Sequence, residues 1–162
     1  MSKLHCLENN WKLWFHNINN NDWSINGYEE IYKFNSIEEF IILFRKINNF
    51  SAGMFFVMKE DIEPLWENKY NKNGGYWSFK ILKKNINSIW YNLTSQIIGN
   101  NILKDIEKHS DINGISLSPK INNCIIKIWF SKAYDDMNIF NIDTLQNILV
   151  GANIKDSRFI KH

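Results

Sequence analysis

The chain has 162 residues, of which 22% are charged and 44% are hydrophobic, and its formal net charge is +2. These values predict one globular domain over residues 1–162 and exclude a disordered chain. The longest purely apolar runs, Phe40–Phe44 and Met54–Met58, are far shorter than the roughly 20 residues that a membrane-spanning helix needs. The small net charge also argues against bulk DNA binding. Neither a membrane nor DNA is therefore an expected partner.

The cysteines and the N-terminus bear on the compartment. No apolar stretch of the signal-peptide type opens the sequence. Cys6 and Cys124 are the two cysteines, which is too few for a disulfide framework and leaves no C-x-x-C pair for zinc. Free cysteines are typical of a reducing compartment, so we expect a cytoplasmic protein.

The first half of the chain alternates between strand and helix patterns. Trp11–His16 and Tyr28–Phe34 are rich in aromatic and β-branched residues, which predicts two strands. Ser36 and Glu39 have the spacing of a capping box, and apolar residues at helical spacing follow as far as Asn48-Asn49. After the break at Gly53, Met54–Lys59 is predicted to be a third strand.

The second half predicts further strands and two more helices, joined by short connections. Its expected elements are a polar loop over 60–75, a strand Tyr76–Leu82, a helix Asn87–Ile98 closed by Gly99, a hairpin of Ile115–Lys120 and Cys124–Ser131, a helix Asp136–Val150 and a short strand at Phe159-Ile160. This order favours an α+β fold, in which an antiparallel sheet carries the helices on one face.

The sequence gives no pattern for catalysis. The four histidines are His5, His16, His109 and His162, and none belongs to a cluster with metal-ligand spacing. His109 lies in a polar stretch that we interpret as solvated surface. No glycine-rich phosphate loop is present. We therefore expect a protein that is not an enzyme and that uses neither a metal nor another cofactor.

Tryptophan is the unusual component of the composition, with seven residues among 15% aromatics. Trp23 and Trp66 fall in separate loops, where two indoles can face each other across a slot that fits a purine. Glu67 can accept hydrogen bonds from the adjacent N–H groups on the edge of guanine, and a cationic base would also be attracted by the indole faces. The alternative is that Trp66 packs in the core and Glu67 caps a turn.

Several motifs in order resemble one known family. Residues His5–Trp14 follow H-P-L-x-x-x-W-x-L-W except that Cys6 replaces the proline. Ile62–Glu67 follow the start of I-x-P-M-W-E-D with Leu65 in place of the methionine, and Gly74–Trp77 follow G-G-x-W. Trp90, Ile98-Gly99 and Ile126–Trp129 match later blocks. The chain resembles the eukaryotic translation initiation factor 4E family, the proteins that bind the 7-methylguanosine cap of mRNA, as a divergent and short member.

The resemblance implies a fold and a ligand site. The fold would be a curved antiparallel sheet with three helices on its convex face and the cap slot on its concave face. Trp23 and Trp66 would stack on the methylated base, Glu67 and the Trp66 backbone N–H would bind its edge, and Trp129 would touch the N7 methyl group. Capped mRNA would be the ligand, and translation initiation the process.

The phosphate side departs from the family pattern. Lys120 stands where the family has an arginine, and other basic positions of the family are Asn122, Ile125 and Tyr76 here. By the alternation of a strand, Asn122 would share a face with Lys120 and donate a hydrogen bond. We expect Lys120 and Asn122 to hold the phosphates more loosely than in the family. The family's last loop also looks truncated.

The convex face departs further. There the family binds helical peptides of a scaffold initiation factor or of repressors, with the pattern Tyr-x-x-x-x-Leu-Φ. His5, Ile37 and Gly99 keep the family pattern, but Ile41 replaces a tryptophan, and the second helix presents Tyr91, Asn92 and Ser95. We expect altered partner specificity; the alternative is sequence drift that leaves partner binding intact.

For the whole chain the alternative function is an interaction module, regulator or decoy with weakened cap binding.

Overall fold

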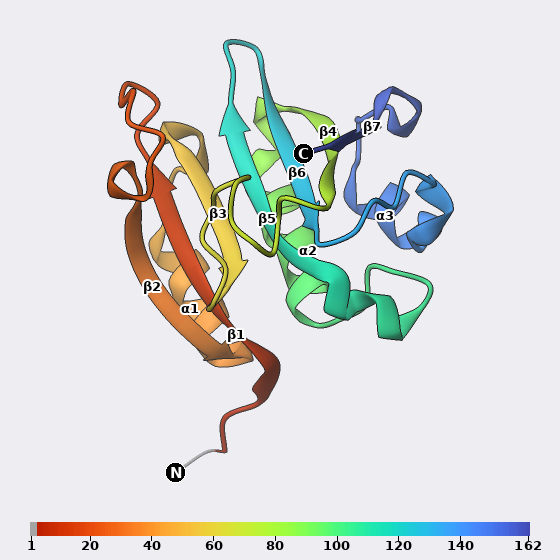
Figure 1. Cartoon of the computed structure of the whole chain (residues 1–162), viewed down its shortest axis with the longest axis horizontal. Coiled ribbons are helices and arrows are strands. Elements are labelled where there is room, and N and C mark those ends of the chain that lie inside the picture. Colours follow the sequence, from red (N-terminus) through yellow and green to blue (C-terminus); the bar gives the residue numbers. More distant parts are fainter. Residues whose placement is uncertain (1–2) are drawn as a thin grey trace.

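A seven-stranded antiparallel sheet forms the centre of the molecule (Figure 1). The structure is a computed structural model and describes residues 3–162. The strand order is β2-β1-β3-β5-β6-β4-β7, and every pair is antiparallel. The strands are β1 (Cys6–His16), β2 (Glu29–Ser36), β3 (Met54–Lys59), β4 (Gly75–Leu82), β5 (Ile112–Pro119), β6 (Asn123–Phe130) and β7 (Arg158–Lys161).

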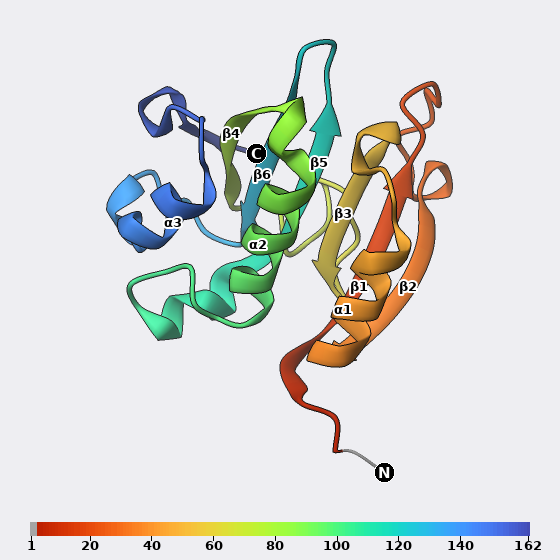
Figure 2. The same cartoon turned by 180° about the vertical axis from the view of Figure 1, so that it is seen from behind.

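The helices gather on one face of this sheet, as Figure 2 shows from behind. They are α1 (Ile37–Lys46), α2 (Ile86–Ile98) and α3 (Ile142–Ile148), and short 3-10 turns lie at Ile25–Gly27, Phe50–Ala52, Lys83–Asn85, Ile106–Asp111, Met137–Ile139 and Ile154–Asp156. The predicted α+β fold, with a curved antiparallel sheet and helices on one face, is confirmed. Within residues 3–162, no helix has the length and apolar character to cross a membrane.

Helix α1 begins where the capping box predicts. The Ser36 hydroxyl accepts a hydrogen bond from the Glu39 backbone N–H at 3.3 Å, and the Glu39 carboxylate accepts one from the Asn35 backbone N–H at 2.9 Å. The first bond satisfies an N–H group that the first helical turn leaves unpaired, and the second ties the start of the helix to the residue before its N-cap. The helix ends at Lys46, two residues before the predicted end.

The predicted third helix, Asp136–Val150, is wrong in its extent. The chain first makes a 3-10 turn at Met137–Ile139, and α3 covers only Ile142–Ile148. Between them Phe140 is fully buried and its backbone bridges to Leu103. This tertiary contact keeps the backbone extended there, and Asn141 then caps α3 through its side chain.

His109 also differs from the prediction of a solvated residue, since it is only 4% exposed. Its Nε2 accepts hydrogen bonds from the backbone N–H groups of Ile102 and Leu103 at 3.1 and 3.0 Å. Burial lowers the pKa of the imidazole below its usual value. His109 is therefore buried although its neighbours in sequence are polar, and its imidazole holds the backbone of the loop that follows α2.

Alternate residues of the strands serve two separate clusters. The larger cluster lies between the sheet and the helices and includes Leu13, Val57, Phe79 and Trp90. The smaller cluster lies on the opposite face and consists of Trp14, Phe56, Met58, Ile62 and Trp129, with Ile25, Tyr28 and Met54 at its margin. We call the second surface the open face, because no helix covers it.

Candidate ligand site on the open face

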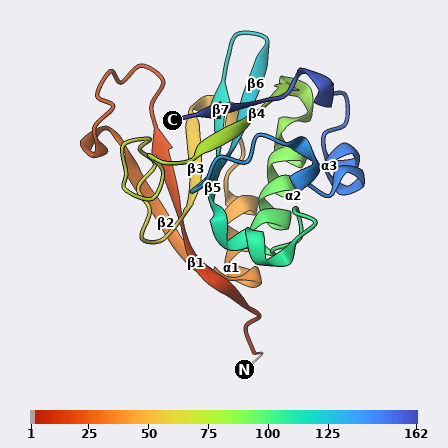
Figure 3. The same cartoon turned by 45° about the vertical axis from the view of Figure 1, so that its right-hand side comes forward.

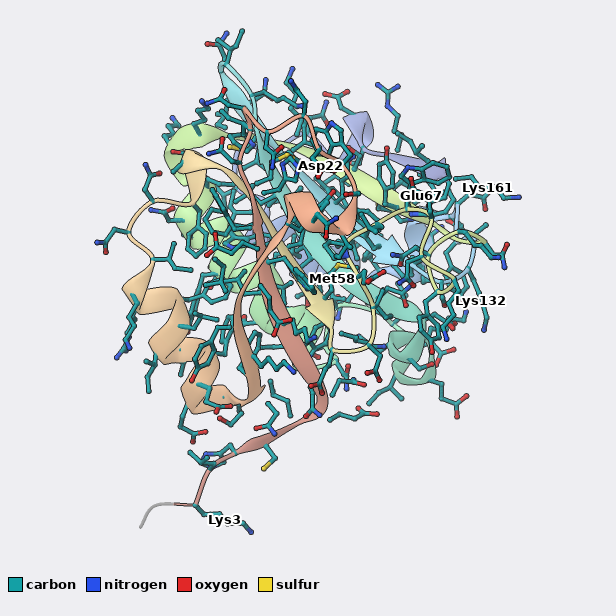
Figure 4. The ribbon with its side chains drawn as sticks, turned by 60° about the vertical axis from the view of Figure 1, so that its left-hand side comes forward. Lys3, Asp22, Met58, Glu67, Lys132 and Lys161 are labelled. Atoms are coloured by element: carbon teal, nitrogen blue, oxygen red, sulfur yellow. The ribbon has the colours of Figure 1, made fainter. Side chains whose placement is uncertain are left out.

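Two loops stand on the open face, opposite the helices. One connects β1 to β2 and carries Trp23, and the other connects β3 to β4 and carries Trp66 and Glu67 (Figure 3). In Figure 4, Met58 marks the middle of the open face, with Asp22 and Glu67 on the two loops beside it. The two loops and the sheet between them form the candidate site.

The seven tryptophans fall into two groups by exposure. Five are buried, with at most 8% of their surface exposed: Trp11, Trp14, Trp77, Trp90 and Trp129. Trp23 and Trp66 are 54% and 57% exposed. A large exposed indole contributes little to the core. The two exposed tryptophans are therefore available for a ligand, and they are the two that the sequence analysis selected for stacking.

Trp23 lies flat on a histidine that the sequence analysis did not select. The His16 ring is fully buried and stacks on the indole with 4.3 Å between centroids and 7° between planes. His16 Nε2 is 3.0 Å from the Asp22 carbonyl oxygen, and the edge of the Tyr28 ring packs against the same imidazole at 4.7 Å. One face of the Trp23 indole is thus supported, which orients the ring before a ligand arrives.

The β1–β2 loop is fixed further by its own polar groups. The Asp22 carboxylate accepts hydrogen bonds from the Ser24 hydroxyl at 2.6 Å and from the Ser24 backbone N–H at 2.9 Å. These bonds lower the pKa of Asp22. These hydrogen bonds join the two residues that flank Trp23 and fix the turn around it.

A buried amide fixes the β3–β4 loop. Asn71 is fully buried, and its Nδ2 donates to the Leu65 carbonyl at 2.7 Å, directly before Trp66. Its Oδ1 accepts from Asn113 Nδ2 of β5 at 2.8 Å, and Asn113 Nδ2 also lies 2.8 Å from the Tyr70 carbonyl. The loop that carries Trp66 and Glu67 is thereby attached to the sheet. Nothing in the asparagine-rich sequence distinguishes these two amides from the many exposed ones.

Glu67 lies near Tyr28, which belongs to the segment between β1 and β2. Burial, together with the negative charge of Glu67, raises the pKa of the Tyr28 phenol to about 12. Glu67 itself is exposed and forms no ion pair among residues 3–162. Its carboxylate is thus free to accept hydrogen bonds from a ligand on the side of the site near Tyr28.

Trp129 lies in the floor of the open face and is 6% exposed. Its Nε1 donates to the Ser116 hydroxyl at 2.9 Å. The rings of Phe56, Tyr76 and His162 surround it, with centroids at 6.4, 6.2 and 5.1 Å. Trp129 is therefore fixed within the smaller cluster, and only a small part of the indole is available to a ligand.

The predicted phosphate residues occupy a turn rather than a strand. Strand β5 ends at Pro119 and β6 begins at Asn123, so Lys120 and Asn122 lie in the hairpin tip, which the Lys120 N–H closes on the Asn123 carbonyl at 2.7 Å. The prediction that they share a strand face is therefore wrong. Figure 1 shows this hairpin extending beyond the neighbouring strands. Burial lowers the pKa of Lys127, and the positive charge of Lys120 lowers it further.

The residues predicted for partner binding lie on the helix side of the molecule. His5 anchors the start of β1 on α1: its Nδ1 is 2.5 Å from the Glu38 carboxylate, and its carbonyl accepts from the Ile37 N–H at 2.9 Å. Ile41 is half-buried against the larger cluster, and Tyr91 stacks on Phe40 with centroids 5.3 Å apart.

The remaining members of this set belong to α2 or follow it. Asn92 and Gly99 are exposed, and the Ser95 hydroxyl is bonded to the Asn92 carbonyl at 2.7 Å. The outer surface of α1 and α2 thus contains the residues that the sequence analysis grouped for a partner, but presents no exposed tryptophan among the described residues.

The fold and the exposed tryptophans define a class of protein with a curved sheet, helices on one face and aromatic loops on the other. Comparisons with known proteins agree. Residues 6–162 match the family model described as Eukaryotic initiation factor 4E. The chain therefore belongs to the eukaryotic initiation factor 4E family.

Individual relatives are distant in sequence. The chain is 26% identical over 160 residues to eukaryotic translation initiation factor 4E-2 of Arabidopsis thaliana, a match that covers 94% of this chain and 65% of the relative. It is 30% identical to the Xenopus laevis eukaryotic translation initiation factor 4E over 135 residues, covering 77% of this chain and 61% of the relative. The chain thus spans less than two thirds of the length of these curated relatives.

A solved structure has the same fold. It is the C. elegans eIF4E-3 protein in complex with the 4E-binding protein Mextli and a cap analog, with a TM-score of 0.84 and 22% identity. The match covers 99% of this chain and 94% of the other. At this identity the comparison shows the shared fold.

Proposed function

We propose that the chain binds the 7-methylguanosine 5′ cap of mRNA, in the cytoplasm, and acts in translation initiation by binding rather than by catalysis. Trp23 and Trp66 stack on the two faces of the methylated base, and Glu67 accepts hydrogen bonds from the guanine edge. Trp129 contacts the methyl group from the floor of the site. Lys120 and Asn122, at the hairpin tip, contribute to phosphate binding.

One observation carries this proposal: the two exposed tryptophans belong to the two loops that stand on the open face, one of them next in sequence to the exposed carboxylate of Glu67. A base with a positive charge suits this arrangement, because the quadrupoles of both indoles and the carboxylate attract cations. Plain guanine lacks that charge. The site therefore favours the methylated base over the unmethylated one.

Titration of the natural chain with 7-methyl-GTP and with GTP tests this proposal, using calorimetry to determine both affinities. We expect clear preference for 7-methyl-GTP. Trp23→Ala and Trp66→Ala should each weaken it by about 1–3 kcal/mol, the range for stacking of a base on an aromatic side chain. Tyr70→Ala is the matched control, since Tyr70 is an exposed aromatic residue of the same loop as Trp66.

Glu67→Gln separates edge recognition from stacking. The amide keeps one acceptor and loses the charge, so the affinity for 7-methyl-GTP should fall by about 1.5–3 kcal/mol, the value of a hydrogen bond to a charged group. Equal binding of GTP and 7-methyl-GTP by the natural chain would contradict the proposed function.

A second partner is proposed for the outer surface of α1 and α2: a helical peptide of a scaffold initiation factor or of a repressor, with altered specificity. The observation that favours altered specificity is Ile41, which is half-buried against the core and offers less surface than an exposed tryptophan. An interaction module with weakened cap binding remains the second candidate function. It would show peptide binding together with negligible affinity for 7-methyl-GTP.

A further inference from the structure

Three neighbouring strands place a row of polar and basic side chains on the open face beside Trp129. Ser78 of β4 is directly opposite Lys127 of β6 on one side and directly opposite Arg158 of β7 on the other. Trp77, Phe79, Ile126 and Ile128 belong to the larger cluster, and Phe159 packs against it. Because side chains alternate along a strand, Ser78, Lys127 and Arg158 all face the open side.

The cations of this row have no counter-ions. Lys127, Arg158, Lys80 and Lys120 form no ion pair among residues 3–162. None of the open-face positions on the three strands is a carboxylate; they are Tyr76, Ser78, Lys80, Leu82, Asn123, Ile125, Lys127, Trp129, Arg158 and Ile160. Asp156 borders the far end, where it lines a hollow of 360 Å³ with Lys80. The row is thus a concentration of positive charge on one surface.

Lys127 is the central cation of this surface. Its side chain is half-buried, with Nζ 4.3 Å from the centroid of the Tyr76 ring. Burial and the positive charge of Lys120 both lower its pKa, and burial together with the charge of Lys127 lowers the pKa of His162. An ammonium group held among like charges and aromatic rings, without a carboxylate, is stabilised when an anion binds.

The position of the row relates it to the aromatic site. Lys127 is two residues from Trp129 on the same face of β6, which corresponds to about 7 Å. From Lys127 across Ser78 to Arg158 the row crosses two strand spacings, about 10 Å. A ligand with its base at the aromatic end would therefore meet Lys127 first and Arg158 later.

We propose that Lys127, Ser78 and Arg158 form a track for the phosphate groups of an RNA chain whose methylated first base occupies the slot. This proposal rests on the proposed function. Lys127 binds the phosphates next to the base, and Arg158 binds the backbone of the nucleotides that follow. The Ser78 hydroxyl donates a hydrogen bond between the two, and Lys80 adds charge beside them. The positive charge that Tyr76 and Ile125 do not supply is thus provided by different residues of the same strands.

Three ligands distinguish the two parts of the track: 7-methylguanosine, 7-methyl-GTP and a capped oligoribonucleotide of ten nucleotides. Lys127→Gln should weaken 7-methyl-GTP and the capped oligonucleotide about tenfold and leave the nucleoside within twofold. Arg158→Gln should leave 7-methyl-GTP within twofold and weaken the capped oligonucleotide about fivefold. For each variant, the salt dependence of oligonucleotide binding should become shallower by about 0.7 in log–log slope, the value for one phosphate contact on a single strand.

The controls separate charge from fold. Lys46→Gln removes one positive charge from the last turn of α1, on the helix side, and should leave all three affinities unchanged. Lys127→Arg keeps the charge and should retain at least half of the affinity. Thermal unfolding of each variant identifies any loss of folded protein. If Lys127→Gln and Arg158→Gln behave as Lys46→Gln does with every ligand, the track is disproved.

An uncapped decanucleotide at low salt makes the test independent of cap recognition. If the natural chain binds none of the methylated ligands, but binds this oligonucleotide in a manner that depends on Lys127 and Arg158, the cap-binding function is wrong and the phosphate track stands. If it binds neither class, both proposals are wrong. If it binds 7-methylguanosine but gains nothing from added phosphates, cap-base recognition stands and the track is overturned.

Discussion

The two faces of the sheet are made by alternate residues of the same strands, yet they differ in composition and in cover. On the helix side, Leu13, Val57, Phe79 and Ile128 form a continuous apolar layer under α1, α2 and α3. On the open face the buried apolar residues form one small cluster, and serine and lysine side chains continue beyond it on β4 and β6. The covered face thus provides most of the stability, while the open face can vary its residues to suit a ligand.

The largest predicted effect is a difference in stability between variants of a buried tryptophan and of an exposed tryptophan. Trp90→Ala, at a fully buried position of the covered side, should lower the free energy of unfolding by about 3–5 kcal/mol because it removes a large side chain and leaves a cavity. Trp23→Ala, at an exposed position, should lower it by no more than about 1 kcal/mol. Urea unfolding measures both. A Trp23 variant as unstable as the Trp90 variant would contradict the division between the faces.

The outer surface of the helix layer provides the next test. Ile41→Trp should strengthen binding of a generic Tyr-x-x-x-x-Leu-Φ peptide by at least about 2 kcal/mol, roughly thirtyfold, because tryptophan is a typical anchor of such interfaces. Ile42→Trp is the matched control: Ile42 is 54% exposed, but points about 100° further around α1. Calorimetry measures both. Tight binding of this peptide by the natural chain, equal to that of Ile41→Trp, would show that partner specificity is not altered.

On the open face, we expect the buried side chain of Asn71 to contribute more to stability than is usual for a loop residue. Asn71→Ala removes the buried side-chain hydrogen bonds that Asn71 makes with the Leu65 carbonyl and with Asn113, which should lower the free energy of unfolding by about 1–3 kcal/mol. Because this loop carries Trp66 and Glu67, the affinity for 7-methyl-GTP should fall as well. Asn73→Ala, an exposed position of the same loop, is the control. Equal behaviour of the two variants would mean that the amide does not fix the loop.

The smallest predicted effect concerns pH. The pKa of His109 is lowered by burial, so the unfolded chain binds a proton more readily than the folded one. The stability contributed by neutral His109 is therefore complete above the unfolded pKa of about 6.5 and declines as the pH falls below it, by at most about 1.4 kcal/mol per pH unit.

Urea midpoints at pH 7.5 and 5.5 measure this dependence. His109→Gln should flatten it, because glutamine does not titrate and can still accept a hydrogen bond. The pKa of His162 is lowered too, so the comparison requires His162→Gln as a second variant. An unchanged pH dependence in His109→Gln would show that His109 is not the responsible group.

Periodicity predicted the elements well wherever the local pattern and the tertiary contacts agree. Strand Met54–Lys59 and the start of α1 at Ser36 were correct, because strand alternation and a capping box are local signals. The third helix was too long because a buried Phe140, held by a partner distant in sequence, interrupts it. His109 was misplaced for the same reason: its hydrogen-bond partners are the backbone groups of another segment.

The sequence by itself determined the class of fold, the family resemblance and the choice of Trp23, Trp66 and Glu67, since these follow from motifs and composition. Only the tertiary structure decided how the site is supported. It placed His16 beneath Trp23 and Asn71 against Asn113, and it aligned Lys127 with Arg158 across β4. The physical reason is strand register: which side chains become neighbours across a sheet depends on the pairing of distant segments, and local sequence does not encode that pairing.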